Sequence, residues 1–409
     1  MAGTKAARST GAATTRSLAQ VNRTAIIELL RNSGALSKRE ICRRTGLSSA
    51  TVNRLTAALL DERIIAVAGS EPSSGGRPSL LLRYAGRARS VASVQVHAER
   101  ASGVLVDLEG RIVFRRDVAL EDSTGPDVPA EHKLEVQERQ LASIGDLLRY
   151  LIAAADRMSA PCVALCVAVP GTVLPPNGLV ASMPEIGWDE IPLGRILGAE
   201  FDLPLVVAND ADALAFGELR RGSGRGSTSL VALLLNRGLG AGIITNGELY
   251  LGATANAGEV GYLLMDRSAF GRSYGEHGDL EDRIGSAAIT RQARERGIPV
   301  PDGTLTTAEE ILALASNGDR AAQELATEIV DMISMAVAAL VIILDPELVV
   351  IASTFGNAEA LVPEIQRRLT GRIIRVPRIE VAAFREDAVL IGAAELAAAE
   401  VNNFAYLSY

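Results

Sequence analysis

The chain has few cysteines and no apolar run long enough to cross a membrane. Three cysteines, Cys42, Cys162 and Cys166, are too few for a disulfide framework or a four-cysteine metal site. The longest strongly apolar run covers residues 332–344. It is shorter than the roughly 18 residues that a bilayer span needs, and the N-terminus lacks the apolar core of a signal peptide. These absences predict a cytoplasmic protein with reduced, buried thiols and no membrane segment.

The charge of the chain is divided unequally along its length. The net charge is −8 over 409 residues, which are too many for one comfortable core and predict at least two packed units. Residues 1–89 contain 15 Lys and Arg against 5 Asp and Glu, a balance of +10, which leaves −18 for the remainder. A basic head on an acidic body indicates that the head meets nucleic acid, because counterion release drives such binding. A solvated charged face is the alternative.

The basic head has the pattern of a helix-turn-helix. Residues 1–16 are small, polar and free of acidic side chains, so we expect a disordered basic arm. Apolar residues at helical spacing predict a first helix over residues 22–33. Ser37 and Glu40 have the spacing of a capping box for a second helix. Ser48 then caps a third helix, whose buried stripe is Val52, Leu55 and Leu59.

A β-wing follows the third helix. Strands are expected at residues 64–68 and 80–84, with a glycine-rich loop between them. The loop glycines let the backbone approach DNA closely, and Arg77 before the rigid Pro78 is suited to a narrow minor groove. We therefore expect a winged helix-turn-helix domain over residues 17–86, although a three-helix domain for protein contact is the alternative. The expected DNA contacts are Arg39, Ser48, Ser49, Thr51, Asn53, Arg54, Gly75, Gly76, Arg77 and Pro78.

The body alternates strands and helices as far as the C-terminus. This order predicts an α/β fold of two lobes with a cleft between them. Strands are expected at residues 91–96, 162–169, 205–208, 230–235 and 348–351, a hairpin at 104–117, and long helices at 132–158 and 321–344.

Several ordered segments together resemble one protein family. They are the helix-turn-helix head, the Asn209-Asp210 pair, the glycine-rich run at residues 238–261 and the segment that ends at Glu281. In this order they resemble the ROK family of repressors, open reading frames and sugar kinases, over nearly the whole chain. The resemblance implies the two-lobed, ribonuclease H-like body shared by actin, Hsp70 and hexokinase, with sugar bound between the lobes.

The resemblance also implies how the chain divides into domains. The winged helix-turn-helix is followed by a first kinase-like lobe at residues 87–208 and a second at residues 209–385. Residues 386–409 then return to the first lobe as a C-terminal helix.

The elements that hold ATP in kinases of this family are altered here. The first phosphate loop, Asp-x-Gly-Gly-Thr in the kinases, is Gln-Val-His-Ala-Glu-Arg at residues 95–100. The second, Gly-Thr-Gly-x-Gly, is Asn-Arg-Gly-Leu-Gly at residues 236–240. In the kinases a Gly-Gly pair makes room for adenosine. The corresponding residues here are Ala352 and Ser353, and the bulky Phe355 is nearby. Since phosphoryl transfer depends on positioning and charge at these places, we expect no enzyme activity and no cofactor. A sugar kinase with an appended regulator is the alternative.

The positions that match sugar ligands are better kept. The matching aspartate in kinases is the general base, and without ATP Asp210 would only hold a sugar hydroxyl. The resemblance implies these ligand contacts: Gly171, Asn209, Asp210, Glu259, Tyr262 and Glu281. A plain Asn-Asp turn and two surface glutamates are the alternative interpretation.

The zinc site of the family is not kept. The family motif Gly-Glu-x-Gly-His ends here in Tyr262, which either points its hydroxyl at a ligand or fills the pocket. The zinc loop Cys-x-Cys-Gly-x-x-Gly-Cys-Leu-Glu corresponds to residues 272–281, where the three cysteine positions are Arg, Tyr and Asp. His277 beside carboxylates cannot replace the thiolates, so we expect no metal and a loop that folds without one.

These features predict a sequence-specific transcriptional regulator, in particular a repressor of carbohydrate metabolism. A sugar or sugar derivative would control it without phosphotransfer. Symmetric operators and the family resemblance imply a homodimer, or a dimer of dimers, on palindromic or pseudopalindromic double-stranded operator DNA. The alternative is a regulator of the same fold that senses a partner protein or a non-sugar metabolite.

Overall fold

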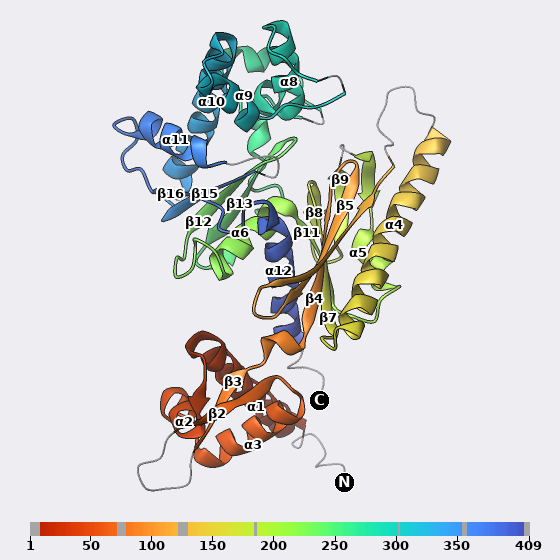
Figure 1. Ribbon diagram of the computed structural model, residues 1–409, viewed down its shortest axis with the longest axis vertical. Helices are drawn as coiled ribbons and strands as arrows, with labels where there is room; N and C mark the ends of the chain where they lie inside the picture. The colour runs from red at the N-terminus through yellow and green to blue at the C-terminus, as the bar shows by residue number, and fades with distance from the viewer. Residues whose placement is uncertain are drawn as a thin grey trace, which may run out of the picture.

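The computed structural model describes most of the chain in three parts (Figure 1). The described residues are 9–71, 79–121, 130–183, 186–275, 277–301, 303–353 and 358–404. The N-terminal head lies at one end of the molecule, and the two lobes of the body lie side by side beyond it.

The head contains three helices, α1 (Ser9–Ser33), α2 (Lys38–Thr45) and α3 (Ser49–Asp61). Because α1 begins at Ser9, the expectation of a disordered arm is wrong for residues 9–16, whereas residues 1–8 lie outside the described part. The segment contains no proline to end a helix, and its one glycine costs only about 1 kcal/mol. The helix backbone therefore continues through it.

Capping side chains fix the ends of α2 and α3. The Ser37 hydroxyl accepts a hydrogen bond from the Glu40 N–H at 3.4 Å, and α2 ends at Gly46 with a φ of 71°. The Ser48 hydroxyl accepts from the Thr51 N–H at 3.2 Å. The second and third helices are thus confirmed. Their apolar faces pack with α1 in one core that includes Ile26, Leu30, Ile41, Val52, Leu55, Leu59 and Leu82.

The wing is an antiparallel pair, β2 (Ile65–Glu71) and β3 (Ser79–Tyr84). A short strand, β1 (Leu36–Ser37), pairs with β3 and makes a third strand that the sequence did not predict. The expected contacts Gly75, Gly76, Arg77 and Pro78 lie outside the described residues.

The first lobe is built on a five-stranded sheet in the order β11-β7-β4-β5-β6. The strands are β4 (Ser90–Val96), β5 (Arg100–Asp107), β6 (Ile112–Ala119), β7 (Cys162–Val169) and β11 (Leu205–Asn209). The helices α4 (Ala130–Arg157) and α5 (Leu193–Gly198) cover one face, and α12 (Ala388–Phe404) covers the other. The interior strand β7 is therefore apolar on both sides.

A small antiparallel sheet extends this lobe toward the cleft. Its strands are β8 (Thr172–Leu174), β9 (Leu179–Met183) and β10 (Trp188–Ile191). The buried Trp188 anchors it, because the indole N–H donates to Gln140 Oε1 on α4 at 2.8 Å.

The second lobe is built on a sheet in the order β14-β13-β12-β15-β16. The strands are β12 (Leu230–Leu235), β13 (Leu239–Thr245), β14 (Glu248–Leu249), β15 (Leu348–Ser353) and β16 (Arg378–Val381). The other elements are the helices α7 (Glu281–Ile284), α8 (Ser286–Glu295), α9 (Ala308–Ser316), α10 (Arg320–Leu344) and α11 (Leu361–Leu369), with short 3-10 turns η3 (Val260–Tyr262) and η4 (Arg267–Gly271). Helices of this set and one face of the sheet share a large apolar core.

Helix α10 is long and apolar enough to cross a membrane, judged by length and composition alone. Its most apolar window has a mean hydropathy of 2.2, and 39% of that window is buried. The helix packs against α8, α9 and α11 in the core of the second lobe. A single helix in such a position is weak support for a membrane span.

Two helices, α6 (Asp210–Arg220) and α12, pack against each other between the sheets (Figure 1). Helix α6 lies on β12 and β13 of the second lobe, and α12 lies on β4 and β7 of the first. They cross at Gly217 and Gly392, where a Cβ on Gly392 would stand 1.8 Å from the Ala213 carbonyl oxygen. The close crossing makes the two helices one packed unit that joins the lobes.

Candidate ligand pocket and DNA-binding surface

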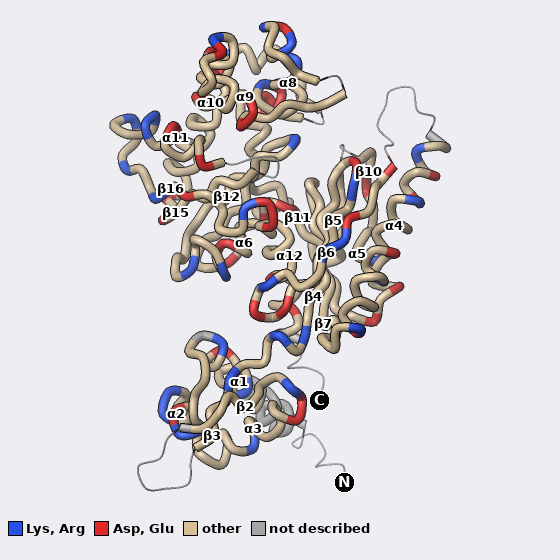
Figure 2. The backbone as a smooth tube through the Cα atoms, viewed as in Figure 1, with Lys and Arg blue, Asp and Glu red and all other residues tan. Residues whose placement is uncertain are grey.

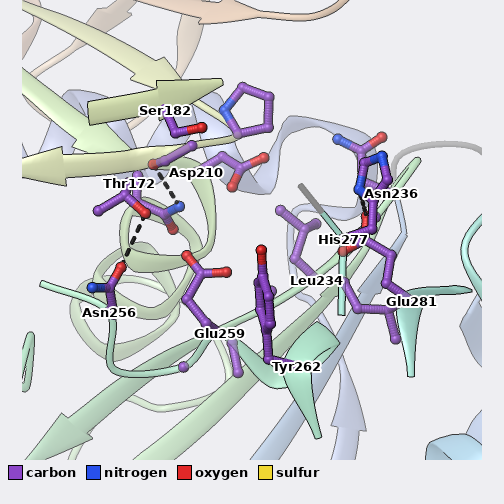
Figure 3. A pocket seen from close by; sticks show the side chains of 18 of the residues that line it. Thr172, Ser182, Asp210, Leu234, Asn236, Asn256, Glu259, Tyr262, His277 and Glu281 are labelled. Atoms are coloured by element: carbon purple, nitrogen blue, oxygen red, sulfur yellow. Dashed lines mark hydrogen bonds and ion pairs between the residues drawn. The ribbon is translucent and has the colours of Figure 1, made fainter. Parts of the chain in front are cut away.

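A cavity of about 760 Å³ lies between the two lobes. All six residues expected to contact a ligand line this one cavity: Gly171, Asn209, Asp210, Glu259, Tyr262 and Glu281 (Figure 3). They come from the turn after β7, the junction of β11 and α6, the residue before η3, the end of η3, and the first residue of α7. The fold therefore brings together side chains that are more than 100 positions apart in the sequence.

Asn209 and Asp210 stand where strand β11 becomes helix α6. Asn209 caps the helix, because its Oδ1 accepts from the Ala211 N–H at 2.8 Å and from the Asp212 N–H at 3.1 Å. Its side-chain amide donates to the Gly171 carbonyl at 3.1 Å and so joins the start of α6 to the turn after β7. Asp210 is only 5% exposed, and its carboxylate accepts from the Ala211 N–H. The positive end of the helix stabilises a negative charge at this place.

Glu259 and Glu281 form the acidic opposite wall. Burial and, second, the charge of Glu281 raise the pKa of Glu259 above its ordinary value. His277 Nδ1 lies 3.4 Å from Glu281 Oε1. Gly238 makes room for this carboxylate, since a Cβ there would stand 2.3 Å from Oε1.

The pocket contains polar side chains that were missing from the expected ligand set. They are Thr172, Ser182, Asn236, Asn256 and His277. The Thr172 hydroxyl donates to Asn256 Oδ1 at 3.1 Å and links the first lobe to the segment before η3. Isolated threonine, serine and asparagine residues carry no motif. Thr172 and Asn256 could have been indicated only by their positions, two residues after Pro170 and three residues before Glu259.

Asp212 is a further acidic group beside the pocket. Burial and, second, the charge of Glu259 raise its pKa to about 7. Its ionisation near neutral pH would add a negative charge close to the ligand wall.

Residues 272–281, which correspond to the zinc loop of the family motif, are held together here by hydrogen bonds. Asp279 is 1% exposed and accepts from the Tyr274 hydroxyl at 2.7 Å, from Arg283 Nε at 3.0 Å and from the Met265 N–H at 2.8 Å. Burial opposes the charge of Asp279, but these donors together lower its pKa. Tyr274 and Asp279 occupy two of the three positions that are cysteine in the family motif. A direct hydrogen bond therefore joins two residues at positions where the motif has zinc ligands. The described residues contain no group of three or more His, Cys, Asp or Glu arranged for a metal.

Tyr262 forms a wall of the pocket and is tied to the same loop. Its hydroxyl donates to the Gly275 carbonyl at 2.6 Å, and its residue is 44% exposed. The ring therefore borders the cavity, and its hydroxyl proton points to the loop.

The nucleotide side of the cleft is partly occupied by the protein itself. Arg237, in the turn that matches the second phosphate loop, pairs with Glu99 of the first lobe at 2.7 Å. The cavity beside it, lined by Asn236, Ser286 and Ser353, has a volume of only about 20 Å³. That volume is room for about one water molecule.

The head exposes the polar face expected to meet DNA. Arg39 on α2 is exposed, as are Ser48, Ser49, Asn53 and Arg54 at α3, and Thr51 is half-buried. Figure 2 shows Lys and Arg at α2 and around the head. Asn53 Oδ1 accepts from Lys38 Nζ at 3.0 Å, so the two helices share a polar contact on this face.

Comparison with known proteins gives the family. The ROK family model matches residues 105–400, and a winged helix-turn-helix DNA-binding model matches residues 21–66. The xylose repressor of Caldicellulosiruptor bescii is 26% identical over 400 residues, which cover 95% of this chain and 98% of that protein. The N-acetylglucosamine repressor of Escherichia coli O157:H7 is 24% identical and covers 90% of this chain and 89% of its own length.

Solved structures show the same fold. A ROK family transcriptional regulator, a homolog of the Escherichia coli Mlc protein, has a TM-score of 0.76 at 22% identity and covers 95% of this chain and 97% of its own. The ROK family glucokinase of Streptomyces griseus, in complex with glucose and AMPPNP, has a TM-score of 0.62 at 24% identity. It covers 76% of this chain and 99% of its own. The chain therefore belongs to the ROK family and joins a winged helix-turn-helix DNA-binding domain to a sugar-kinase-like body.

Proposed function

We propose that this protein is a transcriptional repressor of carbohydrate metabolism whose operator affinity is set by a sugar or sugar derivative. The observation that carries the proposal is that all six expected ligand residues line one interlobe cavity. The relatives support the proposal, because two that span most of the chain are named as xylose and N-acetylglucosamine repressors. We propose that the protein acts in the cytoplasm, because a repressor must reach operator DNA.

The charge of the pocket favours a ligand without phosphate. Three carboxylates, those of Asp210, Glu259 and Glu281, line the cavity, and its described lining contains no Lys or Arg. Carboxylates accept hydrogen bonds from hydroxyl or amine donors, whereas a phosphate would meet like charges in a poorly solvated site. A neutral sugar or an amino sugar therefore fits better than a sugar phosphate.

We also propose that the body binds its ligand without phosphotransfer. Arg237, in the turn that matches the second phosphate loop, is held by an ion pair with Glu99 of the first lobe. Glu99 would also repel the phosphates. Sugar phosphate formed from ATP above a no-protein control would overturn this part of the proposal.

The DNA partner is proposed to be a palindromic or pseudopalindromic operator bound by a homodimer or a dimer of dimers. A helix-turn-helix head reads one half-site, so a two-fold operator requires two heads. The expected contacts are Arg39 and the exposed residues of α3, together with the wing loop.

The test is a thermal-shift screen against neutral sugars, amino sugars and their phosphates, followed by operator mobility shifts with the best ligand. A sugar at 100 times its Kd should stabilise the protein by about 2.7 kcal/mol. If no carbohydrate raises the melting temperature, the sugar-binding role fails. The second candidate, a sensor of a partner protein or non-sugar metabolite, then takes its place.

A further inference from the structure

One buried carboxylate joins the DNA-binding head to the body. Glu395 of α12 is 4% exposed and pairs with two arginines. Arg221 Nε lies 2.5 Å from its Oε1, and an amino nitrogen of Arg31 lies 3.1 Å from its Oε2. Arg31 belongs to α1 of the head, whereas Arg221 caps the C-terminal end of α6. A single side chain thus bridges the head and the body.

Helix α6 connects this bridge to the ligand pocket. It begins at Asp210 in the pocket and ends one residue before Arg221, over 11 residues or about 16 Å at 1.5 Å per residue. The helix is also locked to α12 at the close crossing of Gly217 and Gly392. A displacement of α6 relative to the first lobe therefore reaches the Arg221 end.

Arg221 also holds the turn between β5 and β6. It donates to the Glu109 and Leu108 carbonyls at 2.5 and 2.9 Å. The Leu108 N–H in turn donates to the Gly86 carbonyl at 3.0 Å, in the short connection between the head and the body. The same arginine thus anchors both the connection and Glu395.

The remaining junction between head and body contains a cavity and a further contact, in which Arg89 donates to the Glu62 carbonyl of the head at 3.0 Å. The cavity has a volume of about 730 Å³ and is lined by residues of both parts that include Glu28, Arg31, Glu109, Arg221 and Arg225. The junction therefore has room for the head to change its orientation. A buried carboxylate that needs its cationic partners is well suited to select one orientation.

We propose that Arg31, Glu395 and Arg221 are the connection through which pocket occupancy controls the orientation of the head. This inference rests on the proposed function. A ligand that bridges the lobes favours one position of the packed pair α6 and α12, which sets where Glu395 and Arg221 lie relative to Arg31 of the head. Operator affinity follows, because a dimer binds two half-sites only at one spacing of its heads.

The experiment compares full-length wild type with Arg31→Met, which keeps an apolar stem and removes the charge. Xylose, N-acetylglucosamine or glucose is used, whichever raises the melting temperature most. In wild type we expect operator Kd to change by roughly 5- to 150-fold on saturation with sugar. In Arg31→Met that ratio should fall to about 2-fold or less, while the sugar Kd stays within about 2-fold of wild type.

The matched control is Arg115→Met, which removes an ion pair to Asp387 just before α12 but does not touch the head. It should keep the wild-type ratio. If Arg31→Met unfolds, Glu395→Gln gives the same comparison with an isosteric change. A wild-type ratio in both variants overturns the connection alone, whereas a wild type that no sugar affects overturns the proposed function as well.

Discussion

Asp210 and Asp212 lie two positions apart at the start of α6 but have different surroundings. Asp210 lines the pocket, and the Ala211 N–H stabilises its carboxylate. Asp212 does not line the cavity, and burial with the nearby charge of Glu259 raises its pKa to about 7. Asp210 is therefore suited to contact a ligand, and Asp212 is suited to change charge near neutral pH.

Replacement of Asp210 by Asn should weaken sugar binding. The change keeps the size of the side chain and removes the negative charge of the carboxylate that accepts a hydrogen bond from a sugar hydroxyl. A charge-assisted hydrogen bond is worth about 1.5–3 kcal/mol, so the sugar Kd measured by calorimetry should rise about 10- to 150-fold. Operator affinity without sugar should not change, because the head is untouched. The exposed Asp282→Asn is the control, and equal sugar affinities of Asp210→Asn and wild type would exclude Asp210 as a ligand group.

Asp212 should make stability depend on pH. Its pKa rises from 3.8 to about 7 on folding, so between these values the folded protein holds a proton that the unfolded chain has lost. The free energy of unfolding contributed by Asp212 therefore falls as pH rises through this window, by at most about 1.4 kcal/mol per pH unit. Asp212→Asn should show a shallower fall in urea titrations between about pH 4 and 7. Parallel curves for the variant and wild type would contradict the assignment.

At the scale of elements, the loop of residues 272–281 is held by hydrogen bonds at positions that correspond to cysteines in the zinc motif of the family. Asp279 accepts three hydrogen bonds, from Tyr274, Arg283 and the Met265 N–H. Arg283 also pairs with Asp266 at 2.7 Å, at the N-cap of η4. Met265 before η4, Tyr274 in the loop and Arg283 of α7 thus meet at one buried carboxylate, and we expect it to hold the loop without a metal ion.

Tyr274→Phe should destabilise the second lobe without any involvement of zinc. The change removes the hydroxyl bond to the buried Asp279 carboxylate and leaves that carboxylate with one hydrogen-bond donor fewer. The melting temperature of the variant should fall, and Ser273→Ala, an exposed neighbour, should not change it. A chelator should leave the wild-type melting temperature unchanged, and metal analysis should find well under one zinc per chain. About one zinc per chain would refute the hydrogen-bonded replacement.

Helix α3 should carry operator affinity through Arg54, which is exposed next to Asn53 on its polar face. Arg54→Ala should weaken binding by about 1–3 kcal/mol if the arginine contacts a base. A phosphate contact would instead reduce the slope of log affinity against log salt by about 0.9. The exposed Arg320→Ala on α10 is the control. Unchanged mobility-shift curves at all salt concentrations would remove α3 as the recognition helix.

Elements with strong local signals were predicted closely from the sequence. Capping serines marked α2 and α3, and a continuous apolar run marked β7 and β12 with the bounds that the structure has. The two-residue strand β1 had no such signal, because its partner β3 is distant in sequence. The strands of the small sheet β8-β9-β10 follow one another closely, but each is only three to five residues long and so carries a weak pattern. The N-terminal extension of α1 was missed because a polar composition does not by itself end a helix.

The pocket was predicted unevenly for a related reason. Residues that belong to family motifs, such as Asp210 and Glu259, could be named before the fold was known. Thr172 and Asn256 could not, since only the approach of the two lobes brings them within 3.1 Å of each other. The bridge of Arg31 and Glu395 joins residues 364 positions apart and has no local pattern at all.

At the scale of the whole molecule, the two lobes share α6 and α12 as a common layer. Apolar side chains of both sheets and both helices form one core, with Val91 and Cys166 from the first lobe and Leu234 and Val350 from the second. The pocket lies at one end of α6, and the bridge to the head lies at the other. Ligand and DNA therefore act on opposite ends of one packed unit.

This arrangement predicts that sugar and operator affect each other's affinity by the same factor. In a linked system, the ratio of operator Kd with and without sugar must equal the ratio of sugar Kd with and without operator. We expect a factor of roughly 5 to 150, which corresponds to about 1–3 kcal/mol of coupling. Calorimetric titration of sugar into free protein and into the protein-operator complex gives one ratio, and mobility shifts at zero and saturating sugar give the other. A second DNA of equal length without the operator serves as the control. Two ratios that differ by more than their errors would mean that the sugar acts outside this two-site linkage, for example by changing the oligomeric state.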